Sequence, residues 1–228
     1  VYNSGLFIQK QAQLSDNQIS IGYVDDVVHL VAADKLPRAL DMLQQEGKRS
    51  LEWGAKFGAV FDKKKAVPMI FSHKQLKPPL FQFGGMNLPF SNCTRWLGIL
   101  LDQKLTFSEQ VKKVKKLGTL SILQLGRIVK STYGLNPGLT RKLVIAVVYS
   151  RVLFGSIVWY TARNAKGVKD VLDSIYFQAG RLITGMFKQT PLVFVRKGCG
   201  LRSLMAVHVK NTHAYVLKAL TYPPFHPI

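Results

Sequence analysis

The sequence predicts an α+β protein in which a mixed α and β part, residues 1–105, is followed by an all-helical part, residues 106–221, and a proline-rich tail, residues 222–228. Short β-branched and aromatic runs separated by turn residues occur in the first part, whereas long stretches of helical periodicity fill the second. The charge changes at the same place. Up to Leu105 there are thirteen Lys and Arg and nine Asp and Glu; from Thr106 onward there are nineteen and three.

The first element expected is a β-hairpin. Residues 19–23 and 27–32 are rich in Ile, Val and Tyr and flank Val24, Asp25 and Asp26, as two strands flank a tight turn. Because both runs are apolar, we expect the strands to be buried and the two carboxylates to lie close to them.

A helix and several short strands are expected next. The helix is predicted by apolar and small residues at helical spacing: Leu36, Leu40, Leu43, Gly47 and Leu51. Pro37 suits its first turn and Gly54 its end. Strands are expected at residues 56–61, 67–72, 80–83 and 96–101. Gly84 and Gly85 predict a tight turn between two of them.

Four periodic stretches predict the helices of the second part: residues 108–131, 137–161, 167–185 and 201–220. Ser108 suits the N-cap of the first. At 100° per residue, that helix has a core stripe: Val111, Val114, Gly118, Ile122, Leu125 and Val129. A separate basic face consists of Lys112, Lys116, Arg127 and Lys130. Glu109 is the only acid in this stretch, and a face of one charge sign suits a phosphate backbone better than internal ion pairs.

The composition restricts the class of protein further. A net charge of +20 favours a polyanionic partner, and nucleic acid is favoured over an anionic membrane surface. No run of eighteen apolar residues predicts a membrane span, and no secretory signal opens the chain, so we expect a protein that is neither secreted nor membrane-bound. Cys93 and Cys199 are too few for a disulfide framework. Cys199, His208 and His213 could supply three zinc ligands, but no Cys-x-x-Cys spacing accompanies them and the two histidines lie five apart in a predicted helix, so a zinc site is not favoured.

The adjacent carboxylates Asp25 and Asp26 carry the strongest chemical signal. Two like charges about 5 Å apart repel by roughly 3 kcal/mol at an effective dielectric near 20, so a cation is expected to neutralise them. Mg²⁺ takes oxygen ligands and, in nucleotidyl transfer, activates a 3′-hydroxyl and stabilises pyrophosphate. We assign Asp25 the direct role and Asp26 the supporting one. An ordinary surface turn explains most isolated Asp-Asp pairs; here Tyr23, Val24 and the apolar flanks favour a site.

Two further segments have both a structural and a functional interpretation. Lys63, Lys64 and Lys65 could form a solvated loop, or a lysine could supply charge or a proton to a leaving pyrophosphate. The segment from Trp96 to Gly98 could be core packing in which Gly98 permits close backbone approach.

These motifs together resemble the reverse transcriptases of non-LTR (LINE-type) retrotransposons. Residues 22–26, Gly-Tyr-Val-Asp-Asp, resemble the catalytic turn, and residues 61–66 resemble the next motif of the palm domain. Residues 95–102, Arg-Trp-Leu-Gly-Ile-Leu-Leu-Asp, resemble the primer-grip strand. Residues 181–185 and 190–191 resemble the region beyond the thumb, so the resemblance covers most of the chain.

The resemblance implies a partial palm, an antiparallel sheet with a packed helix, over residues 1–105 and a helical thumb over residues 106–221. It implies catalytic Asp25, Asp26 and Lys65, with Mg²⁺ or Mn²⁺ at the two aspartates only in the complete enzyme. Residues implied to contact primer or other nucleic acid are Tyr23, Trp96, Leu97, Gly98, Lys112, Lys116, Arg127 and Lys130. The implied partners are an RNA template, a DNA primer and deoxynucleoside triphosphates, with work in the nucleus or in a cytoplasmic ribonucleoprotein.

The chain also departs from the family pattern. The first catalytic Asp and the Gly-rich segment that checks the nucleotide lie upstream in the family and have no counterpart here, so we expect a fragment that is inactive without the fingers and remaining palm of a parent polyprotein. The alternatives are a non-catalytic nucleic-acid-binding remnant of a degraded element, or a fragment of an intron-encoded or viral polymerase.

Overall fold

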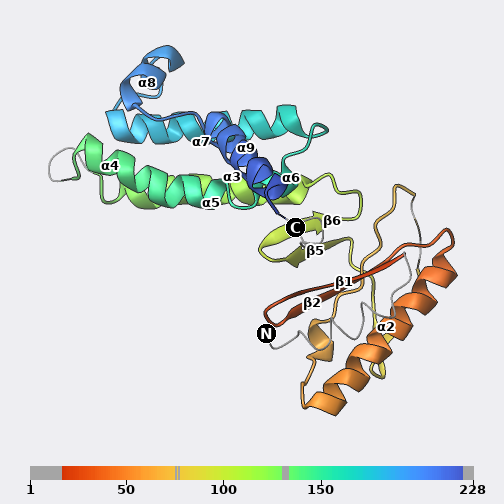
Figure 1. Cartoon of the computed structure of the whole chain (residues 1–228). Coiled ribbons are helices and arrows are strands. Elements are labelled where there is room, and N and C mark those ends of the chain that lie inside the picture. The colour runs from red at the N-terminus through yellow and green to blue at the C-terminus, as the bar shows by residue number, and fades with distance from the viewer. Residues whose placement is uncertain (1–16, 75, 77, 130–133, 223–228) are drawn as a thin grey trace. The chain divides into compact units, whose positions relative to one another are not determined.

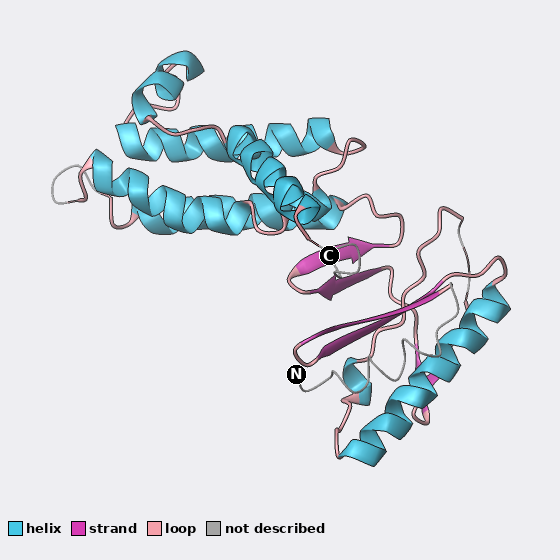
Figure 2. Cartoon of the chain, viewed as in Figure 1, coloured by secondary structure: helices cyan, strands magenta, loops and turns pink. Residues whose placement is uncertain are grey.

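The computed structural model describes residues 17–74, 76, 78–129 and 134–222. The chain divides into two compact units, Val1–Thr94 and Arg95–Ile228. The first unit contains two hairpins and one long helix, and the second is mainly helical (Figure 1). Figure 2 shows the same division by secondary structure. The predicted α+β class is therefore confirmed, whereas the assignment to palm and thumb stays a prediction.

The first unit is built on a hairpin and the helix that packs against it. Strands β1 (Gln18–Tyr23) and β2 (Asp26–Val31) pair antiparallel, from Gln18 opposite Val31 to Tyr23 opposite Asp26. Helix α2 (Leu36–Phe57) contacts β2 and also β3 (Phe81–Phe83), which pairs with β4 (Met86–Leu88). The predicted hairpin and the turn at Gly84 and Gly85 are both confirmed.

The end of α2 corrects one expectation. Pro37 occupies the first turn as predicted, but the helix continues through Gly54 and ends at Phe57, where Gly58 adopts the left-handed conformation with φ of 71°. A Cβ on Gly54 would lie 2.6 Å from the Ala59 carbonyl oxygen. The small size of Gly54 therefore leaves room for the backbone at Ala59, and Gly54 does not end the helix.

Three of the four further strand predictions need correction. Residues 56 and 57 belong to α2, and residues 58–62 form no strand. Within residues 67–72, only an isolated bridge from Met69 to Ser91 forms. The segment 96–101 is not one strand: β5 (Cys93–Trp96) and β6 (Ile99–Asp102) are joined by a turn, because Leu97 and Gly98 both have positive φ. The strand predicted at residues 80–83 is present as β3.

The second unit consists of one hairpin followed by helices. Their bounds are α3 (Ser108–Gly126), α4 (Pro137–Leu143), a π-helical turn (Val144–Tyr149), α5 (Ser150–Val152), α6 (Ser156–Trp159), α7 (Ala165–Thr184), α8 (Leu192–Cys199) and α9 (Leu204–Leu220). In Figure 1, α3, the run from α4 to α5, and α7 lie side by side, and α8 and α9 pack on α7. The predicted helix over residues 137–161 is interrupted at residues 153–155, and α8 was not predicted.

The segment before α3 packs with the helical unit. The backbone N–H of Leu100 in β6 donates to the Gln110 side chain at 3.0 Å. Asp102 accepts hydrogen bonds from the backbone N–H and the hydroxyl of Thr106, both at 2.9 Å, and from the backbone N–H of Phe107. Burial alone would raise the pKa of Asp102, but these hydrogen bonds outweigh it and the pKa lies below its ordinary value. The compact units therefore divide after Thr94, earlier than the charge change.

The N-cap predicted for α3 is also corrected. Phe107, with φ of 56°, is the residue that precedes the helix, and Ser108 is already helical. The Asp102 side chain orders this turn instead of the Ser108 hydroxyl.

The core of the second unit confirms most of the stripe predicted on α3. Val114, Ile122 and Leu125 are buried and Val111 is partly buried, whereas Val129 lies beyond the helix. Gly118 faces α7 so closely that an added Cβ would lie 2.7 Å from Cδ1 of Ile175. The small residue lets two helices approach each other where a larger side chain would separate them.

We expect Gly118→Ala to lower the free energy of unfolding by about 1 to 3 kcal/mol, since the added methyl group forces Ile175 or the backbone to move. Gly167→Ala is the matched control, because nothing lies within 4 Å of the Cβ position on that α7 residue. It should raise the free energy of unfolding by up to about 1 kcal/mol through helix propensity. Chemical denaturation of both variants measures the difference, and equal stabilities would contradict the close-packing account.

Candidate active site and nucleic-acid interface

The two candidate catalytic carboxylates lie at an exposed, strained hairpin tip. Tyr23 and Asp26 pair across the hairpin, so Val24 and Asp25 form a two-residue turn. Val24 has φ of 56°, a conformation that is rare for a β-branched residue and costs roughly 1 to 3 kcal/mol. Asp25 and Asp26 are exposed, and neither forms an ion pair with a described residue. Asp25 therefore lies in the turn, next to the strained Val24, and Asp26 lies at the first position of β2.

The strands beside the turn are more exposed than expected. Paired residues share one face of a hairpin, so Tyr23 and Asp26 lie on the same face as Ile21 and Val28 and as Ile19 and Leu30. The exposed fractions of Ile19, Ile21 and Leu30 are 56%, 38% and 39%. The expectation of buried flanking strands is thus wrong for this face, because α2 covers the opposite one.

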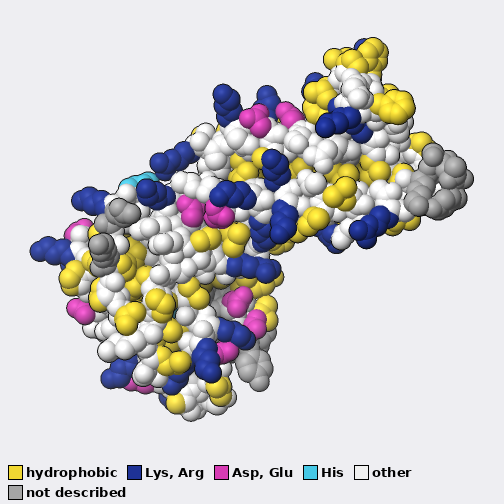
Figure 3. Space-filling model, turned by 180° about the vertical axis from the view of Figure 1, so that it is seen from behind, with side chains coloured by type: hydrophobic (Ala, Val, Ile, Leu, Met, Phe, Trp, Pro, Cys, Tyr) yellow, Lys and Arg dark blue, Asp and Glu magenta, His cyan; other side chains and the backbone are white. Residues whose placement is uncertain are grey.

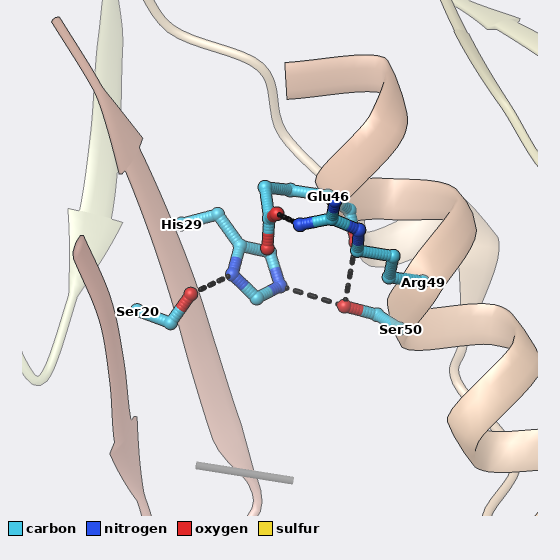
Figure 4. A network of polar contacts seen from close by, with 5 residues as sticks. All are labelled: Ser20, His29, Glu46, Arg49 and Ser50. Carbon is cyan, nitrogen blue, oxygen red and sulfur yellow. Dashed lines mark hydrogen bonds and ion pairs between the residues drawn. The ribbon is translucent and has the colours of Figure 1, made fainter. Parts of the chain in front are cut away.

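A hydrogen-bonded histidine joins the hairpin to α2. His29 bonds through Nδ1 to the Ser20 hydroxyl at 2.8 Å and through Nε2 to the Ser50 hydroxyl at 2.9 Å (Figure 4). Because the Ser50 hydroxyl donates to the Glu46 carbonyl oxygen, it accepts from Nε2–H, and Ser20 then donates to Nδ1. These two hydrogen bonds attach the β1–β2 hairpin to α2.

Glu46 lies next to this connection and forms an ion pair within α2. It is 1% exposed, and one of its carboxylate oxygens accepts from the Arg49 guanidinium at 2.7 Å. Sequence reasoning did not select Ser20, Glu46 or Ser50. The position of the turn could have predicted that Ser20 pairs with His29. The sequence gives no local signal for which residues of α2 contact that pair.

The three lysines form a short 3₁₀ turn, Lys63–Lys65, that Asp62 organises. The Asp62 side chain accepts from the backbone N–H of Lys64 at 3.1 Å, and its other oxygen lies 3.4 Å from Nζ of Lys65. Nζ of Lys63 donates to the Gly84 carbonyl at 3.0 Å. Lys65, 85% exposed, thus pairs with Asp62, and the structure does not bring it into an ion pair with Asp25 or Asp26.

The predicted Trp96, Leu97 and Gly98 segment lies at the β5–β6 turn. A Cβ on Gly98 would lie 3.0 Å from the ring of Phe154, so Gly98 does permit close approach, but of a side chain of its own unit. Nζ of Lys113 donates to the Gly98 carbonyl at 2.6 Å. Burial, and secondarily the nearby Arg95, lowers the pKa of Lys113. These contacts support the packing interpretation, and contact with a primer stays a prediction.

The basic face predicted on α3 is smaller in the structure than in the sequence. Lys112 and Lys116 are exposed on the helix, and Nζ of Lys112 lies 2.6 Å from the Glu109 carboxylate. Arg127 is exposed at the C-cap, after the helix has ended. Lys130 lies outside the described residues.

Two of the three residues considered as zinc ligands, His208 and Cys199, have other partners. Nδ1 of His208 bonds to the Ser156 hydroxyl at 2.9 Å, and the ring lies 4.5 Å from that of Tyr160. The Cys199 sulfur lies 3.5 Å from the hydroxyl of Tyr176, whose pKa burial raises to about 12. Among the described residues, no three His, Cys, Asp or Glu side chains are grouped as metal ligands would be.

We expect the buried His208 to make stability depend on pH. Burial lowers its pKa below the ordinary value of 6.5, so the unfolded chain binds the proton more readily. Stability contributed by the neutral ring is therefore present above pH 6.5 and is lost as pH falls from there towards the folded pKa. Urea unfolding at pH 7.5 and 5.5 should show a smaller decrease for His208→Gln than for the unchanged chain. An identical decrease in both would count against this role.

Comparison with known proteins gives curated relatives. No family model and no solved structure matches the chain. The chain is similar to curated proteins of retrotransposable elements and a transposon. In the described part of the chain, no helix has the length and apolarity to cross a membrane.

Three relatives specify the resemblance. A putative 115 kDa protein of the type-1 retrotransposable element R1DM of Drosophila melanogaster is 28% identical over 67% of this chain and 14% of its own length. A retrovirus-related Pol polyprotein of element R1 of Nasonia vitripennis is 20% identical over 70% of this chain and 49% of its own. A probable RNA-directed DNA polymerase of the X-element transposon of Drosophila melanogaster is 25% identical over 78% of this chain and 19% of its own length. The chain thus spans less than half of the length of each relative.

Proposed function

We propose that the chain is part of an RNA-directed DNA polymerase of a non-LTR retrotransposon and supplies one metal-binding turn of its active site. The observation that carries this proposal is the exposed Asp25–Asp26 pair on a turn where Val24 has φ of 56°. Backbone strain of this kind concentrates at functional sites, where the surrounding structure maintains it. The names of the relatives support the reaction class.

The donor set fits part of a magnesium site. Asp25 and Asp26 offer hard oxygen ligands, and Mg²⁺ commonly takes one or two carboxylates and completes its shell with water and substrate phosphates. Bound there, Mg²⁺ or Mn²⁺ would lower the pKa of a primer 3′-hydroxyl and neutralise charge on the leaving pyrophosphate. Asp25 holds the ion directly, and Asp26 supports it.

The remaining residues bind and orient the substrates. Tyr23 lies on the same hairpin face as Asp26 and is 60% exposed, so its ring is accessible to a base or sugar at the primer terminus. Lys65 supplies positive charge to the triphosphate of an incoming deoxynucleotide once it leaves Asp62. The second unit binds the template–primer duplex with Lys112, Lys116 and Arg127. We infer that this occurs in a nuclear or cytoplasmic ribonucleoprotein and not on a membrane.

Polymerase activity requires carboxylates and substrate contacts beyond those of this chain. In the described residues, Asp25 and Asp26 have no third acidic, His or Cys side chain grouped with them, and the chain matches under half of each relative. Primer extension on an RNA template with Mg²⁺ tests this. A polyprotein containing residues 1–228 should synthesise DNA, and the 228-residue chain alone should not.

A non-catalytic binding role is the second candidate, and the charge of the second unit favours it, since nineteen Lys and Arg accompany three acids after Leu105. Under that alternative, the polyprotein would bind template–primer duplex but extend no primer. Templated synthesis by the isolated chain would contradict the proposal that other parts of the polyprotein are required for activity.

A further inference from the structure

Helix α8 presents more apolar and cationic surface to solvent than any core role explains. Only Val195 and Cys199 of this helix are buried, and they pack against Gly180 of α7, where a Cβ would lie 2.8 Å from Val195. The exposed apolar side chains of α8 and the preceding loop are Phe187 (82%), Leu192 (47%), Val193 (61%) and Phe194 (60%). Figure 3 shows this gathering of hydrophobic side chains, with Lys and Arg between them, at the end of the helical unit.

The charge around this helix has one sign. Residues 174–228 contain seven Lys and Arg and no Asp or Glu. Lys188 follows Phe187 directly in the chain, Arg196 and Lys197 follow Phe194 within three residues, and all three cations are exposed. The ion pairs found between described residues all involve acids at or before Glu109, so these cations are not neutralised by described acids. A neutral apolar partner would leave this positive charge unpaired. A polyanion would neutralise it, and among polyanions a nucleic acid also offers bases to the exposed rings of Phe187 and Phe194.

The segment is also held in place. The Arg181 guanidinium donates to the Lys188 carbonyl at 3.2 Å, and the Thr190 N–H donates to the Phe187 carbonyl at 3.1 Å, which orders the loop that carries Phe187. At the other end of α8, Nε of Arg141 donates to the Cys199 carbonyl at 2.8 Å. An ordered aromatic side chain loses little conformational freedom when a ligand stacks on it.

We propose that Phe187 and Phe194, together with Lys188 and Lys197, form a binding site for single-stranded nucleic acid. Exposed rings stack on unpaired bases, and neighbouring cations contact the phosphates that link them. Duplex offers no free base faces along its length, so this site selects the unpaired part of a template or target strand. This inference rests on the proposed function only for the choice of nucleic acid as the ligand. The site that it assigns is separate from the basic face of α3.

The test uses the full chain and a fluorescently labelled uridine 20-mer, with a blunt 20-base-pair duplex for comparison. Phe187→Leu with Phe194→Leu keeps apolar area but removes both rings, and should weaken binding of the single strand by tenfold or more. Phe194→Trp should retain binding, and its fluorescence should be quenched by the oligonucleotide. Because both side chains are exposed, neither change threatens folding.

Controls separate this proposal from its competitors. Leu217→Ala, which removes a 66% exposed apolar side chain from α9, should leave single-strand affinity unchanged. Lys188→Gln with Lys197→Gln should lower the salt slope of single-strand binding by about 1.4, whereas Lys210→Gln on α9 should lower it less. Unchanged affinity in the leucine variant would overturn the proposal and leave α8 as a protein-docking surface. Loss of duplex binding with single-strand binding intact would refute only the role proposed for α3.

Discussion

Replacing Asp25 by Asn in the polyprotein should reduce templated DNA synthesis by on the order of a thousandfold or more. The substitution keeps the size of the side chain and removes the charge that we propose holds the metal. A loss of about 4 kcal/mol of transition-state stabilisation corresponds to that factor. Asp26→Asn should cost less, about ten- to a hundredfold, as expected for a residue that supports a ligand. Single-turnover primer extension with saturating nucleotide measures both.

Two comparisons make this expectation specific. Asp34→Asn removes a carboxylate that is equally exposed in the same unit and should leave synthesis unchanged. In the polyprotein, Asp25→Asn should also raise the Mn²⁺ concentration needed for half-maximal synthesis, whereas Asp34→Asn should leave that concentration unchanged. If Asp25→Asn retained wild-type synthesis, or if Asp26→Asn were the more damaging change, the assignment of direct and supporting roles would be wrong.

The elements that were predicted correctly are those whose signal is local. The β1–β2 hairpin follows from two β-rich runs around a polar tip, and α2 and α7 follow from helical periodicity, with Pro37 in the first turn of α2. Gly54 misled the prediction because its small size serves a tertiary contact with Ala59 and not a helix end.

The elements that were missed depend on contacts between segments. A turn at Leu97 and Gly98 could not be predicted from Leu, which rarely adopts positive φ; the Lys113 bond to the Gly98 carbonyl and the packing of Phe154 accompany it. Helix α8 spans only eight residues, which are too few for a helical period to stand out in the sequence.

The candidate site shows the same pattern. The carboxylate pair could be selected from sequence because two adjacent acids between apolar strands need a chemical reason. Its support by His29 could not, since Ser50 lies 21 residues away and meets the ring only when α2 packs on the hairpin. The charge of Lys112 was counted as free, yet Glu109, one turn earlier, partly neutralises it.

The second large effect that we expect is a strong salt dependence of duplex binding by the face of α3 that carries Lys112. If the helical unit neutralises six or more phosphates, its affinity for a template–primer duplex should fall by about a thousandfold between 50 and 200 mM salt. Lys112→Gln with Lys116→Gln should reduce the slope of log affinity against log salt by about two, because each lost phosphate contact removes about 0.9.

Glu109→Gln provides the opposite test. It removes the acid that lies 2.6 Å from Lys112 and leaves both lysines in place, so it should strengthen duplex binding and steepen the salt dependence. Fluorescence anisotropy at four salt concentrations measures all three proteins. A duplex affinity that is independent of salt, or a glutamine variant that binds more weakly, would show that this face of α3 does not contact the phosphate backbone and that the charge of the second unit acts elsewhere.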